Sequence, residues 1–303
     1  MLKRSPVSGF FCKAMRNLTY WLLRGFLTVT GYLPLSVLYV ISSVAAWILK
    51  SVFKYRLEVI QDNLQKCFPD AKEEDIQRWT RQYYRHITDL MVEAWKEFSI
   101  GPGFFKKHVD LENIEVLTDL VERGRSTMLV MGHANSWEWA LQRINLELNV
   151  PYYVLYRPAK SKLSDRLIYH FRARFGIAVT PMGSVMRFLL DNKRNVIAGC
   201  LIADQNPPRK DAIWSNFLGR ETPFFSGFQK LSKRFDHAVL YVKVTKVERG
   251  KYSVRLDPIA EDPKSITEQE MTNIFAQKLG DQITEQIPTW LWSHRRWKYT
   301  RDE

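Results

Sequence analysis

The sequence predicts an α/β fold with a mostly parallel central sheet and helices on both faces, preceded by an N-terminal helical membrane-anchoring segment. Short apolar segments alternate with amphipathic ones from about residue 114 onward, which is typical of βαβ units. Before them, residues 25–49 hold no charge, and they are numerous enough to cross a bilayer, which takes about 20 apolar residues. We therefore expect a membrane anchor with amphipathic helices over residues 1–99 and an α/β domain over residues 100–303.

The uncharged run has positive charge on both sides, because Lys and Arg residues precede it and Lys50 and Lys54 follow it. Positive flanks favour the cytoplasmic side of a membrane, so a simple crossing fits poorly. Gly31 and Pro34 also interrupt the run. We expect two short helices, about 17–30 and 35–53, that dip into the cytoplasmic leaflet and return. A single tilted span and a buried core helix are the alternatives.

The elements after the run follow from hydrophobic spacing. Apolar stripes predict amphipathic helices over 54–66 and 72–98, separated by Phe68-Pro69-Asp70. The α/β domain then contributes helices at 114–122, 137–148, 163–175, 184–192, 228–235 and 266–286. Its strands are expected at 126–131, 152–156, 177–180, 195–203, 238–246 and 252–256, the last two forming a hairpin. Ser265 is the expected N-cap of the last helix, and Pro288 its stop.

Composition narrows the class of partner. The net charge of +13 predicts attraction to anionic lipid, nucleic acid or an acidic protein. Ten Trp residues suit a place where one end of a ring is dry and the other wet. The three Cys residues are far apart, which argues against a disulfide framework or a zinc site and favours a reducing compartment.

One segment carries candidate chemistry: His133 and Glu138 are five residues apart, just after a predicted strand and before a predicted helix. Ligands of open α/β sheets bind beyond the carboxyl ends of strands. A loop at this point lets Glu138 turn back toward His133, and Asn135 or Ser136 can cap the helix. A carboxylate on one imidazole nitrogen fixes the tautomer, so that His133 can take a proton from a hydroxyl. The alternative is a structural histidine followed by a first-turn glutamate.

The segment Gly132-His133-Ala134-Asn135-Ser136-Trp137-Glu138 resembles the H-x-x-x-x-D/E motif of the lysophospholipid acyltransferase superfamily, and more narrowly the lipid A biosynthesis (late) acyltransferases of bacteria. That family's motif often reads G-H-F-G-N-W-E, so Ala134, Asn135 and Ser136 depart from it. Further blocks occur in the family's order over about residues 17–300: Tyr156-Arg157-Pro158, Phe171-Arg172-Ala173-Arg174-Phe175-Gly176, Ala203-Asp204-Gln205-Asn206-Pro207-Pro208, residues 217–223, Phe225-Ser226-Gly227, and residues 290–298. The QNPPRKDAIW stretch at 205–214 also departs from the related enzymes.

The resemblance implies an acyltransferase that moves a fatty acyl chain from acyl carrier protein, or coenzyme A, to a hydroxyl of a bacterial glycolipid, with the lipid A precursor as the best match. It implies His133 as general base and Glu138 as its orienter, and the lack of a Ser-centred nucleophile elbow favours direct transfer. No metal cluster or nucleotide-binding loop is evident in the sequence, so we expect no metal and no cofactor beyond the acyl donor. The remaining site residues are substrate-binding candidates, Arg157, Arg172, Arg174 and Asp204, and membrane-interface candidates, Trp290, Trp292, Arg295, Arg296 and Trp297. Packing of these Trp residues onto the domain is an equal alternative.

The expected partners are acyl carrier protein, a lipid acceptor and a membrane, without nucleic acid, because no nucleic-acid-binding fold is evident. The expected place is the bacterial inner membrane, with the catalytic domain on the cytoplasmic face and a role in lipopolysaccharide biosynthesis. Two alternatives remain. One is an acyltransferase for another lipid, such as an aminolipid, an ornithine lipid or a phosphoinositol mannoside, and the other is a non-catalytic basic protein that binds membranes or nucleic acid.

Overall fold

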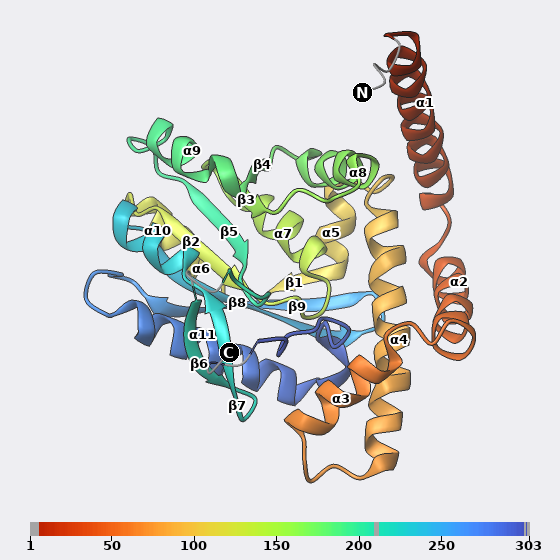
Figure 1. The fold of residues 1–303 in the computed structure, drawn as a ribbon. Coiled ribbons are helices and arrows are strands. Elements are labelled where there is room, and N and C mark those ends of the chain that lie inside the picture. The colour runs from red at the N-terminus through yellow and green to blue at the C-terminus, as the bar shows by residue number, and fades with distance from the viewer. Residues whose placement is uncertain (1–5, 209–211, 300, 302–303) are drawn as a thin grey trace.

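The computed structural model describes residues 6–208, 212–299 and 301. Within these residues, the main sheet has seven strands in the order β1-β9-β8-β2-β5-β3-β4 (Figure 1). The five strands from β8 to β4 are parallel, whereas β9 runs antiparallel to β8 and carries β1 parallel to itself. The predicted α/β fold with a mostly parallel sheet is therefore confirmed, as is the hairpin of the last two strands.

The strands of the main sheet are β1 (Val109–Leu111), β2 (Thr127–Met131), β3 (Tyr152–Tyr156), β4 (Ala178–Pro181), β5 (Ala198–Ile202), β8 (Ala238–Glu248) and β9 (Lys251–Ala260). A separate hairpin consists of β6 (Ala212–Phe217) and β7 (Arg220–Phe225). The helices are α1 (Pro6–Gly31), α2 (Leu35–Trp47), α3 (Leu57–Cys67), α4 (Glu73–Lys96), α5 (Pro102–His108), α6 (Glu115–Glu122), α7 (Trp137–Asn145), α8 (Lys162–Ala173), α9 (Val185–Asp191), α10 (Gly227–Phe235) and α11 (Glu268–Glu285).

Helices cover both faces of the sheet because side chains of a strand alternate between its two faces. In β2, Leu129 and Met131 pack with α5, α6 and α7, whereas Met128 and Val130 pack with α10 and α11. Helices α3 and α4 contribute Ile60, Leu64 and other residues to the second of these cores. Helices therefore shield both faces of the sheet from water, which explains why every residue of β2 is buried.

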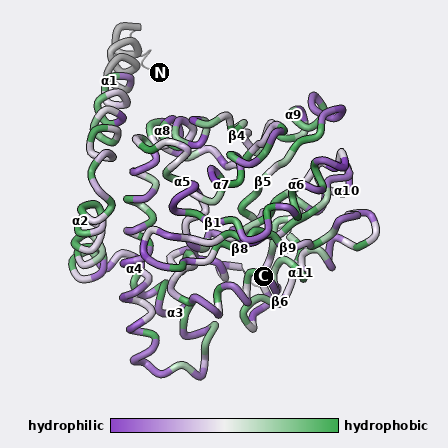
Figure 2. Tube along the Cα trace, turned by 180° about the vertical axis from the view of Figure 1, so that it is seen from behind, coloured by the Kyte–Doolittle hydropathy of each residue, from purple (hydrophilic) through white to green (hydrophobic). Residues whose placement is uncertain are grey.

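The N-terminal run forms two helices rather than one. Helix α1 ends at Gly31, where an added Cβ would lie 2.6 Å from the Ser99 hydroxyl, and Pro34 precedes the first residue of α2. A π-helical turn, Ile48–Val52, continues α2. The segment Leu35–Val52 is long and apolar enough to cross a membrane by length and composition, and 22% of it is buried. Figure 2 shows its hydrophobic colouring, with α2 lying outside α4 on the edge of the molecule.

Two local features differ from the expectations. The N-cap of α11 is Thr267 rather than Ser265, because Thr267 forms a capping box with Glu270. The β6–β7 hairpin was not predicted, since its turn is Leu218-Gly219 and lacks the usual Asn-Gly signal. Both turn residues have positive φ, 52° and 75°, which is the geometry of a type I′ turn.

Candidate active site

His133 and Asp204 come from neighbouring parallel strands. His133 lies two residues beyond β2, Asp204 lies two residues beyond β5, and Met131 pairs with Ile202 at the ends of these strands. The carboxyl ends of parallel strands meet at one edge of the sheet, so the two side chains arrive at the same place. Arg157 follows β3, the next strand beyond β5, and reaches the same edge.

Asp204 holds His133 at two points. Its Oδ1 lies 2.5 Å from Nδ1 of the imidazole, and its Oδ2 accepts the His133 backbone N–H at 2.8 Å. The Trp290 indole also donates to Oδ2, at 2.8 Å. Burial opposes ionisation of Asp204, but His133 and the Trp290 indole together lower its pKa to about 2. The Asp204 carboxylate therefore stays ionised and accepts the proton of Nδ1, which leaves Nε2 free to act as a base.

The turn that carries His133 is held from several sides. Gly132 allows a close approach, because a Cβ there would lie 2.5 Å from the Leu279 side chain of α11. Asn135 is buried with φ of 58°, a left-handed conformation that Asn and Gly tolerate. Its side-chain amide donates to the Val244 carbonyl at 2.7 Å and to Gln286 at 3.1 Å. The related motif has Gly where this chain has Asn135, and Gly also adopts a left-handed conformation without strain.

Ser136 occupies the N-cap position of α7, but its side chain makes no capping hydrogen bond. The expected capping role of Asn135 or Ser136 is therefore wrong. The Asn135 side chain binds the Val244 carbonyl of β8 instead.

Glu138 lies next to the turn but binds another partner. Arg172 of α8 donates to both of its carboxylate oxygens, with Nε 2.8 Å from Oε2, and the neighbouring Trp137 indole donates to Oε1 at 3.0 Å. The expectation that Glu138 turns back onto the imidazole is not met, because the carboxylate on Nδ1 belongs to Asp204. Burial and then the charge of Glu138 raise the pKa of the nearby Glu97 well above its usual range.

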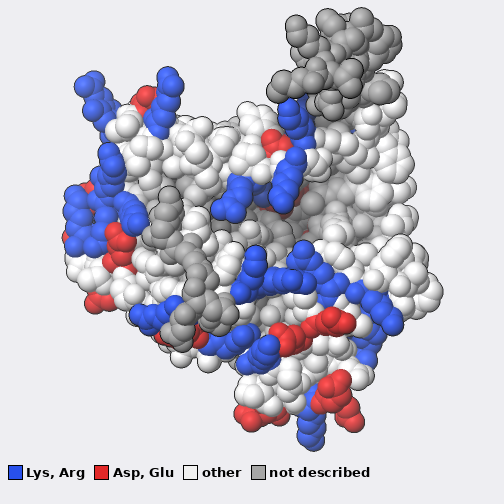
Figure 3. Space-filling model, viewed as in Figure 1, with Lys and Arg blue, Asp and Glu red and all other residues white. Residues whose placement is uncertain are grey.

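A cavity of about 230 Å³ opens beside His133. Arg157 and Arg172 lie on its wall together with Gln205, and the rest of the lining includes the apolar residues Leu155, Ile168 and Met182. The Gln205 amide nitrogen is 3.4 Å from Nε2 of His133. Figure 3 shows Lys and Arg side chains gathered on both sides of a hollow on this face. The cavity therefore combines a basic wall with Nε2 of His133.

A second cavity, of about 170 Å³, lies on the α4 side of the same turn. Its walls are Ile87, Leu90, Met91 and Ala94 of α4, together with residues 135–138. Trp137 lines this cavity and also packs edge-on against His133, with ring centroids 5.1 Å apart. The turn thus separates a basic cavity from an apolar one.

The substrate-binding candidates are only partly brought together. Arg157 is exposed on the first cavity, and Arg172 reaches it while bound to Glu138. Arg174 points elsewhere: its guanidinium donates to the Glu97 backbone carbonyl and lines a groove between α1 and α8. Asp204 contacts His133 rather than an arginine.

The C-terminal aromatic segment corrects an expectation. Trp290, Trp292 and Arg296 are buried at 1%, 0% and 0% exposure, so these side chains pack inside the protein and not against a lipid surface. Trp297 is half-buried, and its indole donates to Thr222. Arg295 alone of the five candidates is exposed. Most of these aromatic and charged side chains pack and hydrogen-bond inside the protein. The local sequence pattern alone does not distinguish such packing from contact with a membrane.

Arg296 and Trp290 are site-supporting residues whose roles the sequence did not indicate. Arg296 donates to Asn206 at 2.8 Å and to the Pro223 carbonyl at 2.6 Å, and burial lowers its pKa to about 10. It thereby fixes the loop that follows Asp204. Arg296 and Trp290 both belong to the C-terminal block of the resemblance, and that block is the signal that marked them.

Comparison with known proteins gives a consistent result. The family model described as bacterial lipid A biosynthesis acyltransferase matches residues 10–299. The chain is similar to the lipid A biosynthesis palmitoleoyltransferase of Escherichia coli K12, with 24% identity over 295 residues and 95% of each chain covered. It is equally similar to the lipid A biosynthesis acyltransferase of Shigella flexneri, at 24% identity over the same length and coverage.

Proposed function

The chain belongs to the bacterial lipid A biosynthesis acyltransferase family, and we propose that it moves a fatty acyl chain from a thioester donor to a hydroxyl of a lipid A precursor with His133 as general base. The observation that carries this proposal is the His133–Asp204 pair, set at the ends of neighbouring strands beside an open basic cavity. The relatives' names support the choice of acceptor, and the geometry supports the choice of base.

The proposed reaction is direct. The acceptor hydroxyl oxygen attacks the thioester carbonyl carbon while its proton passes to Nε2 of His133. The resulting tetrahedral intermediate breaks its C–S bond, and His133 returns the proton to the departing thiolate. An ester and a free thiol result, and no acyl-enzyme forms. Asp204 accepts Nδ1–H throughout, so it stabilises the imidazolium that forms during the attack.

Glu138 has a different role in this proposal from the one that its spacing suggested. Its carboxylate fixes the Arg172 guanidinium at the wall of the cavity that contains His133. A planar guanidinium binds phosphate oxygens well, and the held orientation reduces the entropy lost on binding. We propose that Arg172 and Arg157 bind a phosphate of the acceptor, with Glu138 positioning the first of them.

The apolar cavity beside α4 suits the acyl chain. Four apolar side chains of α4 line one side of it, and the turn that carries His133 lines the other side. A thioester carbonyl at Nε2 would extend its alkyl chain past Trp137 into this space. The acceptor would then occupy the basic cavity on the other side of the turn.

The outer surface of α2 supports membrane attachment. Val40, Val44 and Trp47 are 65%, 53% and 63% exposed, and Val37 and Ile41 of the same helix are each 42% exposed. We propose that this surface contacts the inner membrane, where a lipid acceptor resides. The net charge of +13 would attract an acidic acyl carrier protein as the donor.

The test is transfer of a radiolabelled acyl chain by the purified protein in vesicles, with acyl carrier protein or coenzyme A thioesters as donors. The His133→Ala variant should lose at least about 10³-fold in kcat. Equal rates for the variant and the wild type would show that the catalytic assignment is wrong.

Mass spectrometry of lipids from cells with and without the gene tests the acceptor. Deletion should remove one acyl chain from lipid A, and the wild-type gene should restore it, whereas His133→Ala should not. An unchanged lipid A acyl pattern, together with a lost acyl chain on an aminolipid, would contradict the proposed acceptor but not the reaction.

A further inference from the structure

Gln205 places a side-chain amide at the reacting nitrogen of His133. The amide nitrogen lies 3.4 Å from Nε2, and both side chains line the basic cavity of about 230 Å³. Because Asp204 accepts the proton of Nδ1, Nε2 carries a lone pair, and the amide faces that lone pair with an N–H. The contact is long for a hydrogen bond, so it is readily given up when an acceptor hydroxyl takes its place.

The backbone on both sides of Gln205 is fixed. Asp204, before it, is buried, and both of its carboxylate oxygens are hydrogen-bonded. Asn206, after it, accepts the Arg296 guanidinium at 2.8 Å and donates to the Arg295 carbonyl at 2.9 Å. The Gln205 side chain is exposed, and within the described residues its one hydrogen bond is the contact with the imidazole. The amide is therefore held near Nε2 and is still available to a substrate.

Several other donors around Nε2 are already committed to partners. Arg172 is bound by both carboxylate oxygens of Glu138. In the turn itself, the backbone N–H groups of His133, Asn135 and Trp137 have acceptors at 2.8, 3.0 and 3.0 Å. The reaction needs an uncommitted donor at this place, because the tetrahedral intermediate of acyl transfer carries a negative oxygen.

We propose that Gln205 is a catalytic residue whose amide N–H donates to this oxyanion. The inference rests on the proposed function, because it concerns the same acyl transfer. As the acceptor hydroxyl oxygen bonds to the thioester carbon, the hydroxyl proton passes to Nε2 of His133, and one electron pair of the C=O bond moves onto the carbonyl oxygen. The Gln205 N–H binds that oxygen at the distance of about 3 Å that such donors keep. When the pair returns to form the ester carbonyl, the C–S bond breaks, and the departing thiolate takes the proton from His133.

The test measures kcat and the KM values for donor and acceptor in vesicles with Gln205→Met, which keeps the length of the side chain but has no N–H. The value of kcat should fall about 10²-fold, whereas both KM values should stay within about twofold. Gln205→Glu, which puts an acceptor oxygen in place of the N–H, should lose at least as much. The matched control is Gln65→Met, at an exposed position of α3, and it should keep the wild-type kcat.

A dithioester donor separates binding of the oxyanion from a purely structural effect. It carries sulfur in place of the carbonyl oxygen, and sulfur is a weak hydrogen-bond acceptor. The wild type should therefore prefer the thioester, and Gln205→Met should reduce the ratio of the two kcat values by about tenfold. A change that merely disturbs the fold lowers both rates alike and leaves this ratio unchanged.

Two results would overturn the inference. One is a Gln205→Met enzyme with the wild-type kcat, and the other is a lowered kcat with an unchanged ratio of thioester to dithioester. His133→Ala is assayed alongside. Activity in that variant would show that the proposed function is wrong, whereas an inactive His133→Ala beside a fully active Gln205→Met would refute the role of Gln205 alone.

Discussion

At the residue scale, one carboxylate holds both the ring and the backbone of His133. Because Asp204 contacts Nδ1 through one oxygen and the His133 N–H through the other, the imidazole cannot rotate without losing a hydrogen bond. Trp290 fixes the second oxygen in turn. The proposed base therefore has a defined tautomer and a defined direction before any substrate binds, which is what general base catalysis requires.

Asn135 offers a test of the backbone shape of this turn. Its φ of 58° is costly for Ala, by about 1–2 kcal/mol, but not for Gly. Asn135→Gly should therefore be about 1 kcal/mol more stable than Asn135→Ala, although Gly is ordinarily the less stable of the two. Denaturant unfolding of both variants measures the difference. A more stable Ala variant would contradict the left-handed conformation.

Glu93 predicts a pH dependence of stability. Burial raises its pKa from 4.5 to about 7, opposed by hydrogen bonds from Tyr39, Tyr252 and Ser136 and by the charge of Lys246. The folded state thus binds the proton more tightly than the unfolded state. The stability from Glu93 is fully present below about pH 4.5 and is lost as the pH rises through about 7.

Glu93→Gln removes this titration. The free energy of unfolding of the wild type relative to the variant should therefore fall by about 3 kcal/mol between pH 4.5 and pH 8. Urea unfolding at several pH values measures it, with the exposed Asp191→Asn as the matched carboxylate-to-amide control. A constant difference across this range would contradict the raised pKa of Glu93.

At the scale of elements, the turn after β2 divides two cavities of opposite character. The α4 side is apolar and is lined by Ile87, Leu90, Met91 and Ala94. The sheet side is basic and carries Arg157 and Arg172. Helix α4, which supplies one wall of the proposed acyl cavity, also contacts α7, because the Glu93 backbone carbonyl accepts the Trp139 indole at 3.2 Å.

Ala94→Phe tests the acyl cavity. A phenyl ring would fill part of a space of about 170 Å³, so long acyl chains should be excluded before short ones. We expect the ratio of kcat/KM for a sixteen-carbon donor to that for a ten-carbon donor to fall by about tenfold or more. Competition between the two donors measures this ratio. An unchanged ratio would place the acyl chain elsewhere.

The sequence indicated most of these helices and strands, but not which of them lie side by side in the fold. Periodicity located β2, β3 and β5 to within a few residues, and it placed His133 at a strand-to-helix turn. It did not indicate that β5 lies beside β2, because strand order depends on contacts between distant segments. Asp204 was therefore read as a substrate contact, and the nearer Glu138 as the orienter. Arg172, from a third element, is what draws Glu138 away.

The C-terminal segment is a second case in which the local sequence did not indicate contacts with distant parts of the chain. Trp290, Trp292 and Arg296 have the composition of a membrane interface, yet they are buried. The composition fits a membrane interface and a packed interior equally well. The packing of this segment against β7 and against Asp204 shows that it belongs to the interior. The left-handed conformations of Asn135 and Leu218 were likewise missed, because neither residue is a Gly.

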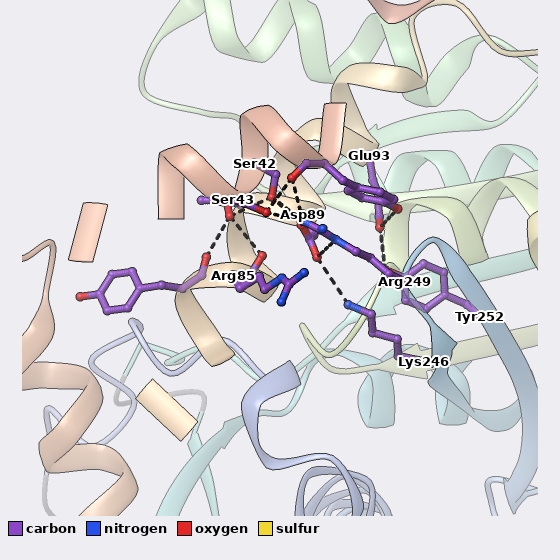
Figure 4. Close-up of polar contacts among 11 residues, drawn as sticks. Ser42, Ser43, Arg85, Asp89, Glu93, Lys246, Arg249 and Tyr252 are labelled. Atoms are coloured by element: carbon purple, nitrogen blue, oxygen red, sulfur yellow. Dashed lines mark hydrogen bonds and ion pairs between the residues drawn. The ribbon is translucent and has the colours of Figure 1, made fainter. Parts of the chain in front are cut away.

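At the scale of the whole molecule, α2 lies on the outer edge (Figure 1). Charged groups of α4 and of the β8–β9 hairpin lie behind it (Figure 4). The tip of the β8–β9 hairpin supplies Arg249 and Lys246 to this interface, and Asp89 pairs with both. A spanning α2 would bring these groups into the hydrocarbon core, at about 2.5–3.5 kcal/mol for each charge. A position in the plane of the membrane, with the outer face immersed, avoids that cost.

This arrangement predicts the topology of α2. In a background with Cys12, Cys67 and Cys200 replaced, Leu33→Cys and Lys54→Cys place one thiol before and one after the helix. Both should react with a membrane-impermeant maleimide from the cytoplasmic side of sealed inside-out vesicles. Protection of one of them until detergent is added would contradict the in-plane position and indicate a span.

The most direct test of the account is the rate of acyl transfer by Asp204→Asn. This change keeps the shape of the side chain but removes the charge that accepts the Nδ1 proton of His133, so kcat should fall by about 10²- to 10⁴-fold. Asp191→Asn, on the exposed end of α9, is the control and should be as active as the wild type. An Asp204→Asn enzyme with wild-type kcat would contradict the claim that the His133–Asp204 pair performs the reaction.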